Sequence, residues 1–592
     1  MHMKKLLIPL FVSAFALTSA AEDYYKVNTA TTSEATAPYI ESSALRLLWC
    51  ANDVNGTLSR GLVDYFVKVR ADSTVSILGA FGSGGGGKFN NMVVALENNS
   101  TLALTSTSNA NIPALAFNPS SNVVHLFKFQ LATGATSATV STTGALAYFS
   151  LSYNSTSEGA DTIDRGIIID NGVTLSTAGS LIVTNSTPTS KTPIFDVKGN
   201  ISVAEGYSIS FENSPLTQAS TSSITADKIG LFNSTATFGG TVAAKTSGAR
   251  TSIILNGGTV NLATGAANTL ENAVVSSSDS SSATALNISN SMSLYSYVVT
   301  NKASSLNVAA GKTLTVGATT SVNLFNNNGT GTINGNLLIY SKDAAHNAST
   351  VLGALTIDGG SVTETSGGGS YGLTTGSNNT VKLINGASVN LAKGFLGISG
   401  NGTYDVDATS LLNVPDFSFF GGGGSLKLAS VSNLKTANMG ILVNGPSGSA
   451  STANLYLTAG TGIYSFGKIS FLRTSNLNVH LGGAEVSFNG VDSLNGVREC
   501  TSTLVFYDFA ESLVKLNIDE TILSADGTIT LTASNTSLKL SAYDTDGNLL
   551  DGDWSVDDNG YLFNSALVPE PAEWAAIFGA LALALAMRRR RK

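Results

Sequence analysis

Residues that could catalyse a reaction are rare in this chain. Charged side chains make up 12% of its 592 residues, and it has four histidines and two cysteines. One short segment, Asp161-Thr-Ile-Asp164-Arg165, places two carboxylates beside an arginine. Paired acids of this kind cleave a glycosidic bond when neighbouring elements bring them together. The same residues also suit a turn before the apolar run at Ile167, and we favour the turn.

A glycine-rich segment matches a phosphate-binding loop in outline only. The run Gly82–Lys88 follows an apolar stretch and satisfies the spacing G-x-x-x-x-G-K. The next residue is Phe89, so the hydroxyl that would hold Mg²⁺ is missing. We interpret the segment as a corner loop, like the run Gly421–Gly424, and expect no nucleotide site.

Acidic residues near the C-terminal end suggest part of a calcium-binding loop. The candidate ligands are Asp544, Asp546, Asp551 and Asp553. The segment lacks the complete D-x-D-x-D-G spacing and the closing glutamate of such a loop. Tight hairpin turns explain the Asp-Gly pairs about as well. Calcium is the one cofactor that the sequence leaves open.

Histidines and cysteines are scattered along the chain. His125, His346 and His480 have no metal-ligand spacing, so we expect none of them to bind a metal. Cys50 and Cys500 lie 450 residues apart. In a long array of stacked coils that separation would be roughly 86 Å, at ~4.8 Å per coil. A disulfide spans only about 4–7 Å between Cα atoms, so the two thiols are not expected to pair.

Composition predicts an all-β chain. Glycine numbers 60 and proline 11, and 43% of the residues are hydrophobic. A disordered chain would be more charged and less apolar. A helical chain would show charged faces at period 3.6, and none precedes the C-terminal tail. What remains is a series of short β segments with neutral polar turns.

A repeat of twenty to thirty residues runs from about Ile167 to Asn444. Its unit is a short apolar alternation, a turn with glycine, and a second alternation, as in IIIDNGVTL, LNVAAGKTLTV and LTIDGGSV. The turn glycines at 311, 335, 359 and 386 follow one another at steps of 24, 24 and 27. One such unit cannot bury its apolar side, but stacked units share a continuous core. We therefore predict a parallel β-helix, or solenoid. An array of antiparallel β-sandwiches is the alternative, because Asn-Gly and Asp-Gly pairs also occur in hairpin turns.

The sequence predicts a cap on each side of the repeat. Residues 22–160 are less regular and richer in aromatic residues around Trp49 and Tyr65, which suits a β cap and first coils. The solenoid is expected over 161–503. Residues 504–567 are acidic and carry hairpin turn signals such as Asp526-Gly527, which predicts an antiparallel β cap.

Both ends of the chain read as processing segments. Residues 1–21 have a basic start at Lys4 and Lys5, an apolar stretch and small residues to Ala21, the layout of a signal peptide. Without residues 1–21 and 568–592, 25 Lys and Arg remain against 38 Asp and Glu, a net charge of −13. Such an acidic body argues against a nucleic-acid partner.

The last 25 residues combine prolines, an apolar run and a basic end. The motif is Val568, Pro569, Glu570 and Pro571; the apolar run includes Trp574, Ala575, Ile577, Phe578, Leu581, Leu583, Leu585 and Met587; the basic end is Arg588, Arg589, Arg590, Arg591 and Lys592. Fourteen apolar residues make a helix of roughly 21 Å, shorter than the ~30 Å bilayer core. The arginines can snorkel, which recovers part of the difference. We expect a short membrane helix with its basic end in the cytoplasm.

This tail resembles the PEP-CTERM sorting signal of exported Gram-negative proteins, in about 25 residues. The segment from Leu504 to the motif looks like the terminal region of Verrucomicrobia-type surface proteins with autotransporter-like solenoid bodies. The resemblance implies an exosortase and the secretion machinery as partners, transient anchoring in the inner membrane, and delivery to the cell surface or a biofilm matrix that contains exopolysaccharide. We expect a non-catalytic structural or adhesin-like protein. A β-helix polysaccharide lyase or hydrolase exported by the same route is the alternative.

Overall fold

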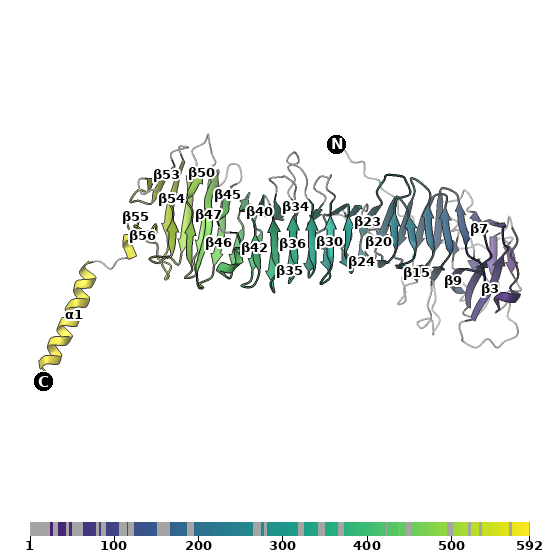
Figure 1. The fold of residues 1–592 in the computed structure, drawn as a ribbon, viewed down its shortest axis with the longest axis horizontal. Coiled ribbons are helices and arrows are strands. Elements are labelled where there is room, and N and C mark those ends of the chain that lie inside the picture. The colour runs from purple at the N-terminus through teal and green to yellow at the C-terminus, as the bar shows by residue number, and fades with distance from the viewer. Residues whose placement is uncertain are drawn as a thin grey trace, which may run out of the picture.

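The computed structural model shows an elongated rod of stacked β coils with a helix projecting from its C-terminal end (Figure 1). It describes residues 24–27, 33–42, 46–49, 63–78, 82–83, 90–105, 115–116, 124–150, 166–185, 194–263, 274–277, 281–317, 325–340, 350–364, 372–392, 394–421, 423–436, 438–445, 451–493, 501–518, 522–531, 536–567 and 571–590.

Three parallel faces form the rod, and each strand pairs with the strand one coil further along the chain. The first face, sheet 1, consists of β3 (Val63–Val69), β6 (Asn90–Leu96), β9 (Val124–Leu131), β12 (Gly166–Ile169), β15 (Ile194–Val197), β18 (Leu216–Gln218), β21 (Ala236–Phe238), β24 (Gly258–Leu262), β26 (Thr284–Ile288), β29 (Ser305–Val308), β32 (Thr330–Ile333), β35 (Ala354–Asp358), β38 (Thr380–Ile384), β41 (Thr403–Val406), β44 (Ser425–Leu428), β46 (Ser451–Leu457), β48 (Ser475–His480), β51 (Thr501–Tyr507) and β54 (Thr536–Ala542).

The second face, sheet 2, consists of β8 (Leu115–Ala116), β11 (Leu146–Ser150), β14 (Ser180–Thr184), β17 (Ser208–Glu212), β20 (Lys228–Phe232), β23 (Ser252–Asn256), β25 (Val274–Ser277), β28 (Ser296–Val299), β31 (Phe325–Asn327), β34 (Thr350–Val351), β37 (Leu373–Thr375), β40 (Phe395–Ser399), β43 (Asp416–Phe420), β45 (Met439–Asn444), β47 (Ile463–Leu472), β49 (Glu485–Phe488), β50 (Val491–Ser493) and β52 (Val514–Leu516).

The third face is split into two shorter sheets. Its first part is β4 (Thr74–Leu78), β7 (Ser100–Thr105), β10 (Ala138–Thr143), β13 (Val173–Thr177), β16 (Asn200–Val203), β19 (Ser223–Thr225) and β22 (Thr241–Ala243). Its second part is β27 (Met292–Leu294), β30 (Thr313–Val316), β33 (Asn336–Ile339), β36 (Ser361–Glu364), β39 (Ser388–Leu391) and β42 (Leu411–Asn413), followed by the short helix η3 (Val431–Asn433).

The strands form because apolar and polar residues alternate along them. In β13, for example, Val173 and Leu175 are buried while Thr174 and Ser176 point outward. The coils of β24, β26 and β29 follow one another after 26 and 20 residues, as the bonds between their facing asparagines show. The predicted parallel solenoid, with its repeat of twenty to thirty residues, is therefore confirmed.

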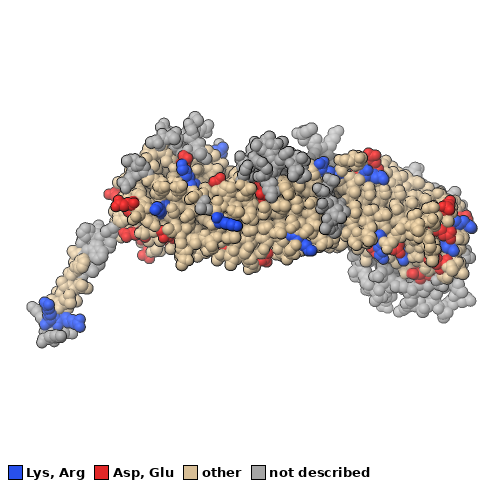
Figure 2. Space-filling view, viewed as in Figure 1, with Lys and Arg blue, Asp and Glu red and all other residues tan. Residues whose placement is uncertain are grey.

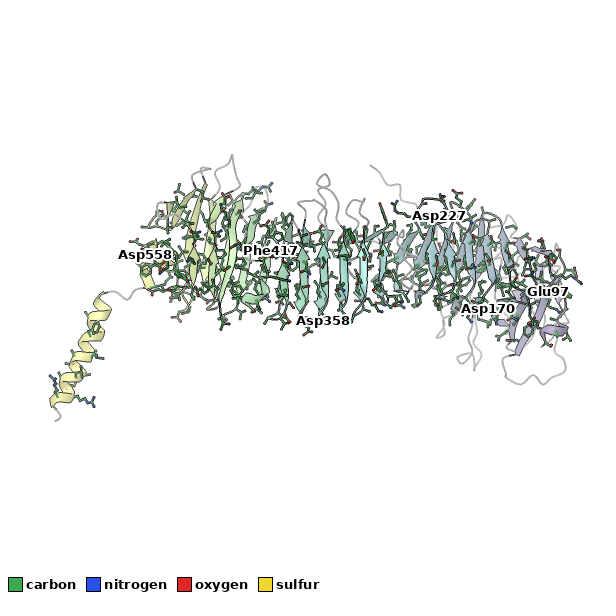
Figure 3. All side chains as sticks on the ribbon, in the orientation of Figure 1. Glu97, Asp170, Asp227, Asp358, Phe417 and Asp558 are labelled. Atoms are coloured by element: carbon green, nitrogen blue, oxygen red, sulfur yellow. The ribbon has the colours of Figure 1, made fainter. Side chains whose placement is uncertain are left out.

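Inward side chains merge into one core that runs the length of the rod. A single cluster of buried hydrophobic residues extends from Ile40 to Leu562. Aromatic rings link one face to another inside it: Phe195 of sheet 1 lies 5.7 Å from Phe211 and 6.4 Å from Phe149 of sheet 2, measured between ring centroids. Figure 3 shows Phe417 in the same interior position among the C-terminal coils.

At the N-terminal end, residues 33–42 close the first coil. Tyr39 pairs with Lys68 of β3, and the side chain of Ile40 enters the core. This segment also contains the short helix η1 (Glu34–Thr36), and β1 (Tyr24–Val27), β2 (Arg46–Trp49) and β5 (Gly82–Ser83) form a small parallel sheet. Covering the first strand in this way protects an edge that could otherwise pair with another chain.

At the C-terminal end, antiparallel pairing appears as predicted but begins later in the chain. Parallel pairing continues through β51 and β52. Antiparallel pairs then form between β53 (Thr528–Leu531) and β54, and between β55 (Trp554–Val556) and β56 (Leu562–Asn564), before η5 (Ser565–Leu567). Trp554 is buried against Phe509, with ring centroids 5.6 Å apart, so the hairpin seals the last coils.

Beyond the cap lies helix α1 (Pro571–Arg590), which begins at the second proline of the tail, where a helix is expected to start. The described residues include no helix with both the length and the apolar character needed to cross a membrane. The tail is thus helical as predicted, and its insertion into a membrane stays a prediction.

Candidate functional site

Apolar residues of α1 are among the most exposed large hydrophobic side chains in the described structure. Phe578, Leu581, Leu583, Leu585 and Met587 are each 57–62% exposed. The helix points away from the end of the rod (Figure 1). Residues 568–570 and 591–592, which include most of the sorting motif and the last basic residues, lie outside the described residues.

The acidic residues of the C-terminal cap close tight turns. Both oxygens of Asp544 accept hydrogen bonds, from the backbone N–H groups of Asp546 at 2.9 Å and Asn548 at 2.7 Å, and from the Asn548 amide at 3.0 Å. The bonds from Asn548 contribute most to lowering the pKa of Asp544. Asp557 accepts in the same manner from the N–H groups of Asn559 and Tyr561. The structure thus gives these carboxylates a role in closing turns.

Calcium binding at this end remains a prediction. Asp551 and Asp553 follow the Asp544 turn, and the Asp553 N–H donates to the hydroxyl of Ser565 at 2.8 Å. Among the residues that the structure describes, no three His, Cys, Asp or Glu side chains are grouped so that they could hold a metal ion.

On the face that Figure 2 shows, charged residues gather near the two ends of the rod. In the view of Figure 2, most acidic side chains lie near the N-terminal and C-terminal coils, and the middle is largely uncharged. Figure 3 labels Glu97 near one end and Asp558 near the other.

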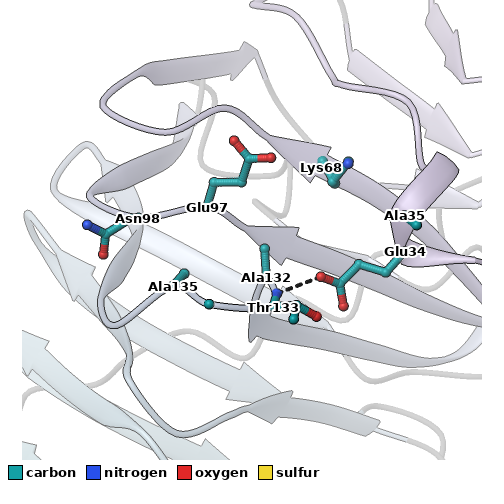
Figure 4. Close-up of a pocket in the computed structure, with 9 residues that line it drawn as sticks. Glu34, Ala35, Lys68, Glu97, Asn98, Ala132, Thr133 and Ala135 are labelled. Carbon is teal, nitrogen blue, oxygen red and sulfur yellow. Dashed lines mark hydrogen bonds between the residues drawn. The ribbon is translucent and has the colours of Figure 1, made fainter.

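A cavity of about 490 Å³ at the N-terminal end brings two carboxylates near a lysine, as Figure 4 shows. Glu34 accepts a hydrogen bond from the backbone N–H of Thr133 at 2.6 Å. Glu97 accepts from the hydroxyl of Tyr39 at 2.6 Å and from a backbone N–H at 3.1 Å. Lys68 lies over the Tyr39 ring, 4.9 Å from its centroid.

The electrostatics of this cavity favour the ionised form of Glu97. The Tyr39 hydrogen bond is the largest influence on Glu97 and lowers the pKa of its carboxyl, and it raises the pKa of Tyr39 in return. A glycosidase needs one carboxylic acid with a raised pKa that can donate a proton. Glu97 does not meet that need; its bond to Tyr39 and the bond of Glu34 to Thr133 tie neighbouring segments to the first coils.

A second cavity, of about 540 Å³, lies beside the loop at residues 241–251, where the third face is interrupted. Asp227 anchors this loop by accepting from the N–H groups of Gly206, Lys245 and Thr246, each at 2.8 Å, and from the Thr246 hydroxyl at 2.6 Å. Partial burial opposes ionisation, but the hydrogen bonds from Thr246 and its neighbours outweigh it and lower the pKa of Asp227 to about 2. Asp227 lies at the rim of the rod in Figure 3.

Several residues singled out in the sequence lie outside the described residues. They are Asp161, Asp164, Arg165, Cys50, Cys500 and His346, together with Gly84–Lys88 of the glycine-rich run. His125 falls within β9 and His480 at the end of β48. The predictions about catalysis and disulfide pairing therefore stay predictions.

One row of outward side chains follows the whole length of sheet 1. We call it the outer row; over its C-terminal two-thirds it consists of Thr237, Asn261, Asn287, Asn307, Thr332, Thr356, Lys382, Asp405, Lys427, Tyr456, His480, Tyr507 and Tyr543. Its asparagines bond from coil to coil: the Asn287 amide donates to Asn261 at 2.8 Å, and the Asn307 amide donates to Asn287 at 2.9 Å. These bonds satisfy neighbouring amides without placing like charges one above another.

The last four positions of the outer row form a stack of rings, which we call the aromatic ladder. Tyr456 and His480 lie 4.2 Å apart, His480 and Tyr507 4.6 Å, and Tyr507 and Tyr543 5.0 Å, measured between ring centroids, with planes within 8° of parallel. All four side chains are partly exposed. Burial lowers the pKa of His480, against the opposing charge of Asp508.

Sequence reasoning missed this ladder. Each ring is the outward residue near the end of a sheet 1 strand, in the segments NLYL, NVHL, VFYD and SAYD. Aligning the strands by coil would have placed Tyr456, His480, Tyr507 and Tyr543 in one column.

Comparison of the chain with protein-family models, with curated proteins and with solved structures finds no match.

Proposed function

We propose that this chain is an exported, non-catalytic structural or adhesin-like protein of the cell surface or extracellular matrix. The observation that carries the proposal is a rod of parallel coils capped at both ends. Asparagines of its outer row bond from coil to coil, and its core is continuous from Ile40 to Leu562. A rod of this kind separates its two ends by a fixed distance and offers long faces, which suits a spacer or an adhesin.

Three ordered carboxylates hold loops, which supports a non-catalytic function; burial raises the pKa of two others, Glu212 and Asp416. Asp227, Asp407 and Asp544 each accept several hydrogen bonds from loop N–H groups. Burial opposes ionisation, but these bonds outweigh it and lower the pKa of each carboxyl, to about 2 for Asp227 and Asp407. Such groups stay ionised at neutral pH and hold loops, and they are poor proton donors.

The tail supports delivery by an exosortase. Helix α1 carries exposed apolar residues on a segment separate from the capped body, and basic residues follow them. A membrane would cover the apolar surface, and the arginines would reach the headgroups. Cleavage near Val568–Pro571 would then free the rod without disturbing its core.

Mass spectrometry of the C-terminus of the native protein tests this proposal. Processing predicts that the last peptide ends near the motif and that the Arg588–Lys592 end is absent from surface material. Replacing Pro569, Glu570 and Pro571 with alanine should leave the tail intact and hold the chain in the membrane fraction. An unprocessed tail on surface-exposed protein would refute the sorting mechanism.

A parallel assay addresses the catalytic alternative. The purified chain should leave soluble polysaccharides uncleaved. Turnover that disappears in the Asp161→Ala and Asp164→Ala variant would replace the structural function with a lyase or hydrolase.

A further inference from the structure

The aromatic ladder borders a flat, half-exposed face near the C-terminal end of sheet 1. Two further rows of outward side chains run beside it over β46, β48 and β51: Thr452, Asn476 and Thr503 in one, and Asn454, Asn478 and Val505 in the other. The Asn478 amide donates to Asn454 at 3.2 Å, and the Asn476 amide donates to the Thr452 hydroxyl at 3.4 Å. The face therefore offers parallel lines of amides, hydroxyls and ring edges.

Coil stacking alone does not explain the ladder. Upstream in the same outer row, Asn307, Thr332 and Thr356 occupy the equivalent positions, and the strands pair there in the same register. Rings replace these small polar residues at four consecutive positions, from Tyr456 to Tyr543. Something other than backbone pairing distinguishes this end of the face.

Charge limits the partner that could lie here. Of the outward residues in the three rows over β46, β48, β51 and β54, one is charged, Lys539, and it forms an ion pair with Asp526 at 3.0 Å. The chain as a whole carries a net charge of −8. A polyanion would be repelled by that charge, and so would a second copy of the chain. An uncharged polymer avoids both penalties.

The spacing and chemistry of the face fit a sugar chain. Each row repeats once per coil, at ~4.8 Å, which is close to the advance per sugar in an extended glycan. Amides and phenol hydroxyls both donate and accept hydrogen bonds, as neutral sugars require. Because the stacked rings cover one another's faces, contact would involve ring edges and hydroxyls rather than stacking on a ring face. The stacking also fixes the side chains in advance, which reduces the entropy lost on binding.

We propose that the face formed by β46, β48, β51 and β54 binds an extended, uncharged glycan chain that lies along the rod axis, with the aromatic ladder as one wall. This inference rests on the proposed function only in placing the rod beside a polysaccharide matrix. It names the binding face and the class of glycan, neutral rather than acidic.

Isothermal titration of the purified full chain in detergent tests this inference. The probes are cellohexaose and mannohexaose as neutral chains and an alginate hexamer as an acidic chain of the same length. At least one neutral hexasaccharide should bind, and the alginate hexamer should not. Tyr456→Phe, Tyr507→Phe and Tyr543→Phe combined should weaken binding about tenfold or more, because three hydroxyl contacts are lost while the stack remains.

Matched variants separate binding from folding. Thr332→Ala and Thr356→Ala change the same outer row upstream and should leave binding unchanged. All variants should keep the thermal midpoint of the parent within a few degrees. Failure of both neutral probes to bind, tighter binding of alginate, or full binding by the triple phenylalanine variant would each overturn the inference. None of these outcomes changes the location of the chain or the processing of its tail, so the proposed function is tested separately.

Discussion

Two glycines at one corner of the rod should respond very differently to substitution by alanine. Gly335 lies directly against the turn of the preceding coil. A Cβ atom at Gly335 would lie 2.2 Å from the Lys312 carbonyl oxygen and 2.3 Å from that of Ala309. Gly311, in that preceding turn, has φ +67° and nothing within 4 Å of its Cβ position. Gly335 is thus needed for space, and Gly311 for its backbone conformation.

The magnitudes follow from the bonds at this corner. In Gly335→Ala the coils must move apart, which weakens the bond from the Asn336 N–H to the Lys312 carbonyl (2.7 Å) and the two bonds to the Val308 carbonyl (3.0 and 3.2 Å). At about 1 kcal/mol for each bond, with some strain, the cost is about 2–4 kcal/mol. Gly311→Ala should lower the free energy of unfolding by about 1–2 kcal/mol, because alanine must adopt the left-handed conformation of Gly311.

Hydrogen–deuterium exchange measures the effect where it occurs, because the stability of a repeat rod is nearly local. Amides of β30 and β33 should lose protection in Gly335→Ala by a clearly larger factor than in Gly311→Ala. Gly311→Asn should have the smallest effect, since asparagine tolerates this conformation. Equal protection in Gly335→Ala and Gly311→Ala would refute the close stacking of the coils at this corner.

Three further predictions concern ionisable side chains. Asp227→Ala should lower the free energy of unfolding by about 0.5–1 kcal/mol, after allowance for solvent screening at this partly exposed group. Because the folded pKa of Asp227 is about 2 against 3.8 when unfolded, this stabilisation should persist above pH 4 and vanish as the pH falls through 2 in an acid titration. The folded pKa of His480 is below 6.5, so the stability of the fold should be highest above pH 6.5, where His480 is neutral, and should decline as the pH falls through the folded pKa. His480→Phe keeps the ring stack and should remove this part of the pH dependence of the thermal midpoint. Asp544→Ala should lower the thermal midpoint slightly, and by the same amount in calcium and in EDTA, because the Asp544 oxygens accept hydrogen bonds from turn N–H groups. A lower thermal midpoint of the variant in calcium alone would support the predicted metal site.

The sequence predicts the rod because its core pattern is local and repeated. Apolar residues alternate in every strand, and glycines such as Gly311 and Gly335 recur at steps near 24 residues. The turn pairs Asp526-Gly527 and Asn559-Gly560 likewise mark antiparallel connections that the structure contains.

Features that depend on register between coils were not predictable from such patterns. The parallel pairing of Thr501–Tyr507 with neighbouring coils precedes the hairpins, although the acidic composition there suggested an antiparallel cap throughout. The aromatic ladder could not be predicted because loops of different length separate its residues. Tyr456 and Tyr543 fall in one column only after the strands are aligned in space. Carboxylate roles such as that of Asp227 depend on long loops, which composition does not specify.

Surface labelling of intact cells tests the central claim most directly. An epitope inserted at Gly460, an exposed position with nothing within 4 Å of its Cβ position, should leave the rod undisturbed. An exported surface or matrix rod predicts that antibody labels the epitope on unpermeabilised cells. Labelling that appears only after permeabilisation would contradict it.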